Sequence, residues 1–588
     1  MVGNGESQVT QYGYDGSGNL IYLKDAEGNV NQYVYNRLGQ VIATYTNGKL
    51  QKQNGYNQLG WQLEETDAVG LKEQNRFTVN GLLESHTDRE SQLHQYSYTP
   101  YNEVNRLSIK GANGVEKYWQ QNNYDPTTRL LIGVTTSEGE PLAYHYDLWK
   151  RLDVQTAAGR NYLLGYDTAD RLATLTYPDG KQVSYTYDNL SRIQTVNYPD
   201  MGGVGYSYSQ GADLNKNVLT YSNGVVQERS YNAFGEIVSS LESKGNVPAW
   251  NESFGYDGFS NITAINRNGI SLGFSYDKLN RIKQENAVTG PNTYSYDERG
   301  NRLSLEGSVT LPSTDSTEYT YNAINQLKTY SNSAGKQATY SYYGDGQRAS
   351  KNVNGQLTRY VYLNGHIIEE LDANGNVKAR NIWGNELLFR KDYAANKGGY
   401  YSYNGHGDVV KITDAAGTAI NTYDYDIWGN VLSSSEGMSN SFKYSGEVYD
   451  DESGLYYLRA RYYDPSIGRF ITEDTYEGQI NNPLTLNLYT YVGNNPLIRW
   501  DPSGHNWVGD QWNGFVSGMK EVHSSWYTAT DYWSLGLVSE VNDYIKVSQE
   551  KPMSLEQWGK AAALFVQVTP MKAATSGTKL GKGRKSIQ

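Results

Sequence analysis

The chain has 588 residues, with 54 tyrosines, 61 glycines, 19% charged residues and a formal net charge of −12. It contains no cysteine, which excludes disulfides, zinc–thiolate sites and a cysteine nucleophile. The acidic balance disfavours general binding of nucleic acid by the body of the chain. Few charges and many aromatic residues also argue against disorder, and so much Tyr and Gly indicates many short strands joined by turns.

The first residues show neither a targeting signal nor a membrane segment. The start, MVGNGESQVTQYGYDGSGNL, lacks the basic and apolar regions of a signal peptide. No window approaches 18 consecutive apolar residues, so no membrane span is predicted. Because a repeat is already under way by Tyr14, we interpret the chain as the C-terminal piece of a longer protein that lacks its N-terminal region.

Residues 1 to about 440 repeat one short pattern, in which an aromatic residue, usually followed by Asp or Asn, precedes a turn. The first anchors are 21 residues apart, later steps range from 20 to 26 residues, and Phe77-Thr78 is a degenerate copy. Spacing this regular identifies a repeat protein. The anchors are Tyr14, Tyr35, Tyr56, Phe77, Tyr98, Tyr124, Tyr146, Tyr166, Tyr187, Tyr208, Tyr231, Tyr256, Tyr276, Tyr296 and Tyr321.

Each unit has the pattern of a strand, a turn and a strand, as in YSYDERGNRLSLEG. Tyr294 alternates with Tyr296 and Leu303 with Leu305, and residues 297–301 between them predict the turn of a β-hairpin. One hairpin cannot bury its own face, so successive units are expected to pair edge to edge into a continuous twisted sheet. Tyr suits such a sheet because its ring packs while its hydroxyl is expected to stay hydrated.

From Tyr340 to Asn430 the strand–turn rhythm continues with longer units. The triplet His406-Gly407-Asp408 in this part invites a metal or catalytic interpretation, but a turn is the interpretation we favour. The seven histidines are scattered without an i,i+4 pair, so no metal site is predicted. No cofactor is predicted either.

Residues 444–504 form the densest motif of the chain. They contain GLYYLRARYYDPSIGRF and end in LYTYVGNNPLIRWDPSG. Together with the Tyr-Asp units, these motifs resemble the YD/Rhs repeat family, which includes polymorphic toxin shells and is related to toxin-complex C components, wall-associated YD-repeat proteins and teneurin YD shells. The resemblance covers roughly residues 10–504.

The resemblance implies an all-β fold, in which a spiralling sheet of YD-repeat β-hairpins forms a hollow shell. It also implies three parts. Residues 1–443 would form the shell, residues 444–504 the Rhs repeat-associated core that plugs it and is a candidate autoprotease, and residues 505–588 a small, mainly α C-terminal tail.

In several members of that family the core segment is an intramolecular aspartyl protease. Carried over to this sequence, the resemblance assigns the two acids to Asp474, after GRFITE, and to Asp501, in the final DPSG, with Arg461 as the supporting cation. Two carboxylates held close cannot both ionise, so one would keep its proton and act as an acid while the other activates water. The scissile bond is expected near His505–Asn506.

The sequence departs from the pattern of self-cleaving members at two positions. Thr475 follows Asp474 where those members usually have Pro, and His505 stands where they have an apolar Leu or Met after the Gly. The alternative is that Asp474 and Asp501 only cap turns, since Asp-Pro-Ser-Gly is itself a good type I turn. The segment would then be a structural plug. On either hypothesis the chain is at most a single-turnover enzyme.

Composition shifts at His505, where the Tyr-Asp rhythm stops and five of the 12 Trp residues follow. A helix is predicted from Ser554, because Ser554 and Gln557 fit a capping box before an apolar face. No effector catalytic site is recognisable, so the tail is interpreted as an effector, a linker or a pretoxin segment. Its basic end would contact nucleic acid only if the tail is a nuclease fragment.

Two functions of different classes follow from the resemblance. In the first, a secreted or cell-surface shell encapsulates its own C-terminal tail as a toxin segment for interbacterial competition, and an immunity protein is a partner. In the second, a cell-wall-associated or secreted adhesion protein binds cell-surface carbohydrate and has no catalytic activity. Encapsulation predicts a tail protected from added protease, whereas adhesion predicts an exposed tail and glycan binding by the body.

Overall fold

The computed structural model describes residues 2–3, 6–210, 215–245, 247–287, 290–307, 317–505 and 508–509. These residues are almost all antiparallel β-structure, which confirms the predicted all-β fold. The predicted mainly α tail, with its helix from Ser554, lies outside the described residues except for His505 and the short strand β48. The C-terminal part of the described residues also contains short 3-10 segments and one short strand: η1 (Tyr444–Gly446), η2 (Pro483–Leu486), η3 (Val492–Asn494) and β48 (Val508–Gly509).

The repeat folds as predicted because the residue after the tyrosine caps the turn that follows it. After Tyr296, the side chain of Asp297 accepts hydrogen bonds from the amides of Arg299 (2.9 Å) and Asn301 (2.8 Å). Gly300 adopts the positive φ of +81° that closes the turn and that favours glycine. The carboxylate therefore replaces the backbone partners that the turn amides lack.

The tyrosine hydroxyls are bonded to the neighbouring hairpin rather than hydrated, which differs from the expectation. Tyr296 Oη donates to the carbonyl of Ile282 at 2.8 Å. That carbonyl lies at the bulge where Tyr276 meets Ile282, so the register shift leaves it available to the next tyrosine. The same bond, to a carbonyl 14 or 15 residues earlier, is made by Tyr35, Tyr98, Tyr146, Tyr166, Tyr187, Tyr208, Tyr276 and Tyr342.

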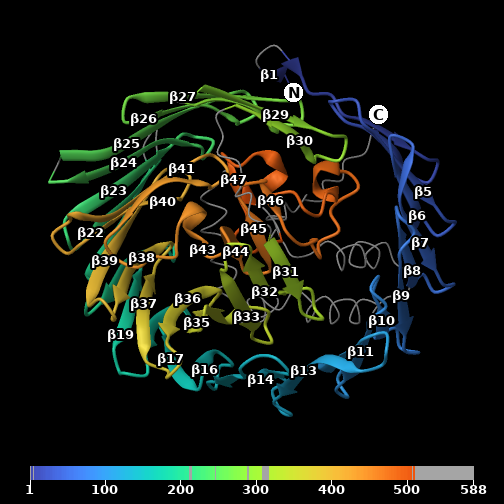
Figure 1. Cartoon of the computed structure of the whole chain (residues 1–588), viewed down its shortest axis with the longest axis horizontal. Coiled ribbons are helices and arrows are strands. Elements are labelled where there is room, and N and C mark those ends of the chain that lie inside the picture. The colour runs from blue at the N-terminus through green and yellow to red at the C-terminus, as the bar shows by residue number, and fades with distance from the viewer. Residues whose placement is uncertain are drawn as a thin grey trace, which may run out of the picture.

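The longest sheet runs from β3 (Gln11–Tyr14) to β30 (Arg302–Glu306), and its strands pair in chain order. It curls into a ring-shaped wall (Figure 1). The two ends of the wall meet where Gln8 Nε2 donates to Asn280 Oδ1 at 2.7 Å. Edge-to-edge pairing of successive hairpins therefore builds the wall, as the repeat predicted.

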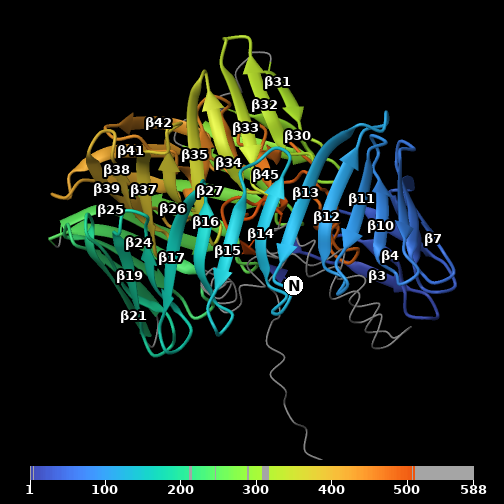
Figure 2. The ribbon, with the colours of Figure 1, turned by 90° about the horizontal axis from the view of Figure 1, so that it is seen from below.

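A second sheet continues the spiral from β31 (Thr317–Tyr321) to β42 (Val431–Glu436). Figure 2 shows it stacked beside the part of the wall that contains β16 to β25. The two layers are joined by buried polar contacts, such as the 2.7 Å hydrogen bond from Tyr162 Oη to Glu369 Oε2, across 207 residues of chain. The second turn of the spiral thus rests on the first.

A small four-stranded sheet lies at the centre of the ring, inside the wall (Figure 1). One continuous hydrophobic core includes Val134 of the wall, Leu388 of the second sheet and Tyr456 of this central sheet. The central sheet is therefore attached to both layers by packing. Its strands are β43 (Val448–Asp450), β44 (Leu455–Leu458), β45 (Arg461–Asp464) and β46 (Arg469–Phe470).

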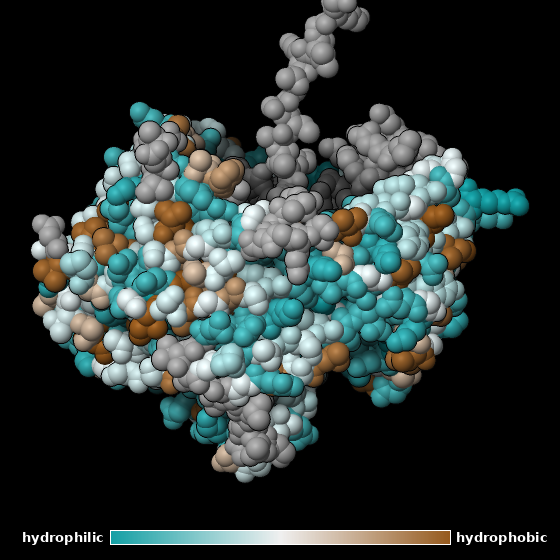
Figure 3. Space-filling view, turned by 90° about the horizontal axis from the view of Figure 1, so that it is seen from above, coloured by the Kyte–Doolittle hydropathy of each residue, from teal (hydrophilic) through white to brown (hydrophobic). Residues whose placement is uncertain are grey.

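The outer surface mixes polar and apolar residues. In Figure 3 the hydrophobic residues of the face seen from above are scattered among hydrophilic ones. Among the residues that the structure describes, no helix has the length and hydropathy of a transmembrane segment.

Candidate functional site

The structure brings together the three residues that the resemblance singled out. Arg461 is the first residue of β45, Asp474 follows β46, and Asp501 follows β47 (Arg499–Trp500). Arg461 Nη2 lies 2.7 Å from Asp474 Oδ2 and 3.5 Å from Asp501 Oδ2. All three side chains are buried. One guanidinium nitrogen therefore faces two carboxylates in a site shielded from water.

Each carboxylate also caps a turn with its second oxygen. Asp501 Oδ1 accepts from the amides of Gly504 (2.8 Å) and Ser503 (3.1 Å). Asp474 Oδ1 accepts from the amide of Tyr476 at 2.9 Å. Turn capping and convergence on Arg461 thus coexist, because each role uses a different oxygen of the same carboxylate.

The surroundings set the charge states of the site. Burial raises the pKa of Asp501, the nearby Asp474 carboxylate adds to this effect, and Arg461 opposes it. Burial also lowers the pKa of Arg461, although the charges of Asp474 and Asp501 act to raise it. The site therefore favours a proton on Asp501 more than an isolated aspartate would.

The chain leaving the Asp501 turn passes directly over Arg461. The carbonyl of Gly504 accepts a hydrogen bond from Arg461 Nε, and the amide of Ala460 donates to the carbonyl of Ser503 at 3.2 Å. Gly504 has φ of +77°, and a Cβ there would collide with the carbonyl of Leu458. Only glycine therefore lets this stretch lie so close to β45.

His505 is buried beside the acids. Its Nδ1 lies 3.0 Å from Asp474 Oδ1 and 3.3 Å from Thr475 Oγ1. The two positions at which the sequence departs from the family pattern thus contact each other. Asn506, and with it the far side of the expected scissile bond, lies outside the described residues.

A second arginine, half-buried, supports the same turn and was missed in the sequence. Arg459 Nη1 lies 2.8 Å from both carboxylate oxygens of Glu447 and also donates to the carbonyl of Pro502. Burial raises the pKa of Glu447, the Arg459 guanidinium opposes this, and Asp501 adds to it. The Arg-Ala-Arg spacing in GLYYLRARYYD was the available signal, because it places two cations two residues apart.

The His406-Gly407-Asp408 triplet forms a turn, as favoured. The amide of Gly407 donates to the carbonyl of Asn404 at 3.2 Å, and His406 Nδ1 lies 2.7 Å from Asp408 Oδ1. The amide of Ser445 donates to that same Asp408 oxygen at 2.9 Å. Among the described residues, no three His, Asp or Glu side chains converge in a metal-binding arrangement.

Two neighbouring parts of the chain match known family models. The teneurin YD-shell family model matches residues 204–497, and the RHS Repeat model matches residues 166–200. The tRNA nuclease WapA of Bacillus subtilis (strain 168) is 35% identical over 292 residues, which cover 47% of this chain and 12% of WapA. The protein named Probable deoxyribonuclease RhsB of Dickeya dadantii is 25% identical over 359 residues, 50% of this chain and 24% of RhsB.

A solved structure of the Photorhabdus luminescens Tc holotoxin pore matches with a TM-score of 0.71 at 15% identity, over 85% of this chain and 31% of that chain. That likeness shows a shared fold. The chain thus spans only a small part of the length of the relatives it matches. Because the teneurin YD-shell model matches half of its residues, and the RHS Repeat model matches the residues just before them, the chain belongs to the YD-shell family of Rhs-repeat proteins.

Proposed function

We propose that this YD shell encloses its own C-terminal residues as a toxin segment and releases them by a single intramolecular cut near His505–Asn506. The relatives support a toxin role, since WapA is named a tRNA nuclease and RhsB a deoxyribonuclease. The shell would act from a secreted or cell-surface location in interbacterial competition. An immunity protein in the producing cell would be its partner.

The proposed reaction is hydrolysis of one peptide bond. The Asp474 carboxylate, which makes the closer ion pair with Arg461, takes a proton from water while the water oxygen attacks the carbonyl carbon of His505. Asp501 supplies a proton to the amide nitrogen of Asn506 as the carbon–nitrogen bond breaks. The products are a new carboxylate on His505 and a new amine on Asn506, and each molecule reacts once.

One observation carries this proposal: Arg461 contacts both carboxylates and the carbonyl of Gly504 at the same time. A turn cap alone would need none of these contacts, because the capping oxygens bond backbone amides instead. The chain offers an internal comparison at Asp464-Pro465-Ser466, a second Asp-Pro-Ser turn, which joins β45 to β46 of the central sheet. There Asp464 Oδ1 caps the amide of Ser466 at 2.9 Å.

That second turn provides a matched control for the experiment. Intact-mass spectrometry of the full chain, purified under native conditions, should find a fragment of residues 506–588 and its complement. Asp501→Asn should abolish both fragments, because an amide cannot supply the proton. Asp464→Asn removes a turn-capping carboxylate of the same type and should still cleave. If the unsubstituted chain shows only the intact, uncleaved mass, as Asp501→Asn is expected to do, the self-cleavage proposal is wrong.

A further inference from the structure

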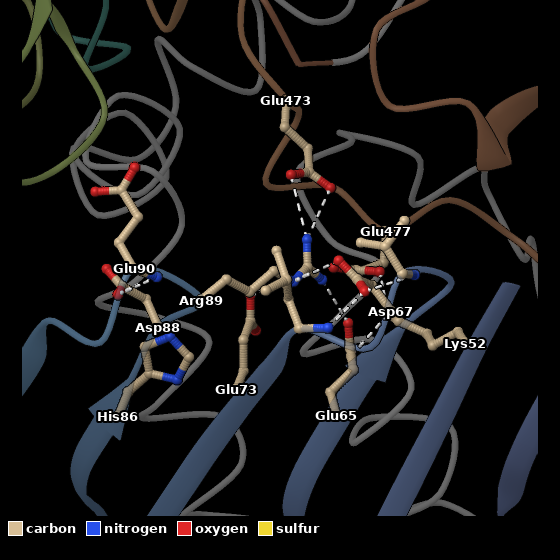
Figure 4. Close-up of polar contacts among 12 residues, drawn as sticks. Lys52, Glu65, Asp67, Glu73, His86, Asp88, Arg89, Glu90, Glu473 and Glu477 are labelled. Atoms are coloured by element: carbon tan, nitrogen blue, oxygen red, sulfur yellow. Dashed lines mark hydrogen bonds and ion pairs between the residues drawn. The ribbon is translucent and has the colours of Figure 1, made fainter.

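Residues 473–480, here called the strap, leave the candidate site and cross the inside of the wall. Glu473 contacts Arg89, Glu477 contacts Lys52, and the carbonyl of Ile480 accepts from Tyr33 Oη at 2.6 Å. Figure 4 shows Glu473 and Glu477 reaching the wall strands from the opposite side. The wall elements involved are β5 (Val30–Tyr35), β7 (Lys49–Tyr56), β8 (Gln62–Asp67), β9 (Lys72–Phe77) and β10 (Leu83–Thr87), which Arg89 follows.

Arg89 and Lys52 also form ion pairs with acidic residues of the wall itself. Arg89 Nη2 lies 3.0 Å from Glu65 Oε1, and Arg89 Nε lies 3.2 Å from Glu73 Oε1. Lys52 Nζ lies 2.8 Å from the other oxygen of Glu65. Glu65 of β8 therefore bridges Lys52 of β7 and Arg89, which follows β10. Lys52, Glu65, Glu73 and Arg89 are called the wall cluster.

The strap adds two acidic side chains to this cluster, and they lie on either side of Asp474 in the sequence. Arg89 Nη1 lies 3.4 Å from both oxygens of Glu473, and Lys52 Nζ lies 2.5 Å from Glu477 Oε2. Asp474 stands between these two anchors. The wall thus fixes the backbone on each side of Asp474, while Arg461 holds its carboxylate.

We propose that Arg89 and Lys52 are positioning residues for Asp474, so that the site is complete only when the wall has closed around the strap. The inference rests on the proposed self-cleavage for its effect on rate, but the placement of the strap can be measured without it. The wall cations do not touch the reacting atoms. They act through Glu473 and Glu477, whose backbone carries Asp474.

The apolar end of the strap supports the same arrangement. Ile480 packs against a separate small core of the wall that contains Leu20, Leu23 and Tyr33. The strap therefore meets three successive parts of the wall, in the order Arg89, Lys52 and Tyr33, as it runs away from the site. Several charged and apolar contacts along its length indicate that the strap is bound to the wall, which a single ion pair would not.

Two measurements on the full chain test the proposal. In the first, hydrogen exchange is followed in the uncleavable Asp501→Asn background, and Arg89→Met should speed amide exchange across residues 471–480 by about tenfold. Arg76→Met is the matched control. Arg76 lies on β9 with a side chain that is 79% exposed, and it should leave that exchange unchanged.

In the second measurement, cleavage is timed after cell-free synthesis of chains that carry an intact Asp501. Arg89→Met should slow the cut by about tenfold or more, because small misplacements of a reacting group cost large factors in rate. Glu473→Gln should slow it similarly, and the double variant should be no slower than either single one, since both remove the same contact. Purely additive losses in the double variant would overturn the pairing.

The two measurements separate the two proposals. If the unsubstituted chain never cleaves but Arg89→Met loosens residues 471–480, self-cleavage fails and the seating of the strap stands. If the unsubstituted chain cleaves while Arg89→Met matches Arg76→Met in both exchange and rate, the positioning role is wrong and self-cleavage stands.

Discussion

The central sheet is anchored by a buried ion pair, whose removal should be costly. Arg348, in β34 (Arg348–Val353) of the second sheet, and Asp450, at the end of β43, are both 0% exposed. Arg348 Nη2 lies 3.1 Å from Asp450 Oδ1 and Arg348 Nη1 lies 2.5 Å from Asp450 Oδ2. Lys351 Nζ also lies 2.8 Å from Asp450 Oδ1. We therefore choose Asp450→Asn, which keeps the shape and removes the charge.

The size of the effect follows from what Asp450→Asn leaves behind. Breaking a buried ion pair by removing one partner costs about 3–5 kcal/mol, because the other charge stays buried without compensation. Lys351 keeps Glu452 as a partner at 3.1 Å, so most of the loss falls on Arg348 alone. We expect the free energy of unfolding to fall by about 3 kcal/mol, the lower end of that range.

Urea unfolding, followed by tryptophan fluorescence and circular dichroism, measures this change. All variants should carry Asp501→Asn so that only intact chains are compared. Lys49→Met is the control, because the Lys49–Glu298 pair lies at the surface, with the lysine side chain 73% exposed, and should change the free energy by less than about 1 kcal/mol. Equal losses in Asp450→Asn and Lys49→Met would refute the assignment of Arg348–Asp450 as the anchor.

Two further predictions concern the wall. Burial raises the pKa of Glu285 to about 7 from its ordinary 4.5, so the folded state binds this proton more tightly than the unfolded state. The free energy of unfolding should therefore fall by about 3 kcal/mol as pH rises from about 4.5 to 7, and Glu285→Gln should flatten that dependence in urea titrations at several pH values. Tyr296→Phe removes the hydroxyl bond to Ile282 and should cost about 1 kcal/mol in the same assay, whereas the exposed Tyr14→Phe should cost little. No loss in Tyr296→Phe would mean that the repeated hydroxyl bond does not stabilise the wall.

The hairpins could be predicted because the contacts that form each turn join residues close in sequence. Asp297 and Gly300 lie within one turn, and the side chain of Asp297 bonds amides only two and four residues away. Such contacts are encoded wherever the motif recurs. The partner of the Tyr296 hydroxyl could not be predicted in the same way, because the free carbonyl of Ile282 exists only once the preceding hairpin has formed its bulge.

The stacking of the spiral could not be read from the repeat. The contact between Tyr162 and Glu369 joins residues 207 positions apart, and nothing in a 20-residue unit sets the pitch that brings them together. The buried charges are equally non-local, as Arg348 and Asp450 are 102 positions apart. Long-range pairing makes burial of these charged groups tolerable.

The candidate site was located by a sequence motif, and the structure adds long-range contacts that the motif does not contain. The resemblance assigned Arg461, Asp474 and Asp501 to one site, and the structure places their side chains within ion-pair distance. It did not reveal Arg89, which lies 384 positions before Glu473 in a turn of a degenerate repeat. That contact could not be predicted, because only the folded wall brings Arg89 and Glu473 together.

The positions of these contacts along the chain suggest when the site can form. Every member of the wall cluster precedes residue 90, and every acid of the candidate site follows residue 473. Contacts of such long sequence separation form late, because the intervening chain must first be ordered. The strap can reach Arg89 and Lys52 only after the ring has brought β7 to β10 round to the central sheet. A cut that depends on Asp474 being held there would therefore be delayed until the wall has closed. On the proposed function, that order would prevent release of the tail outside the shell.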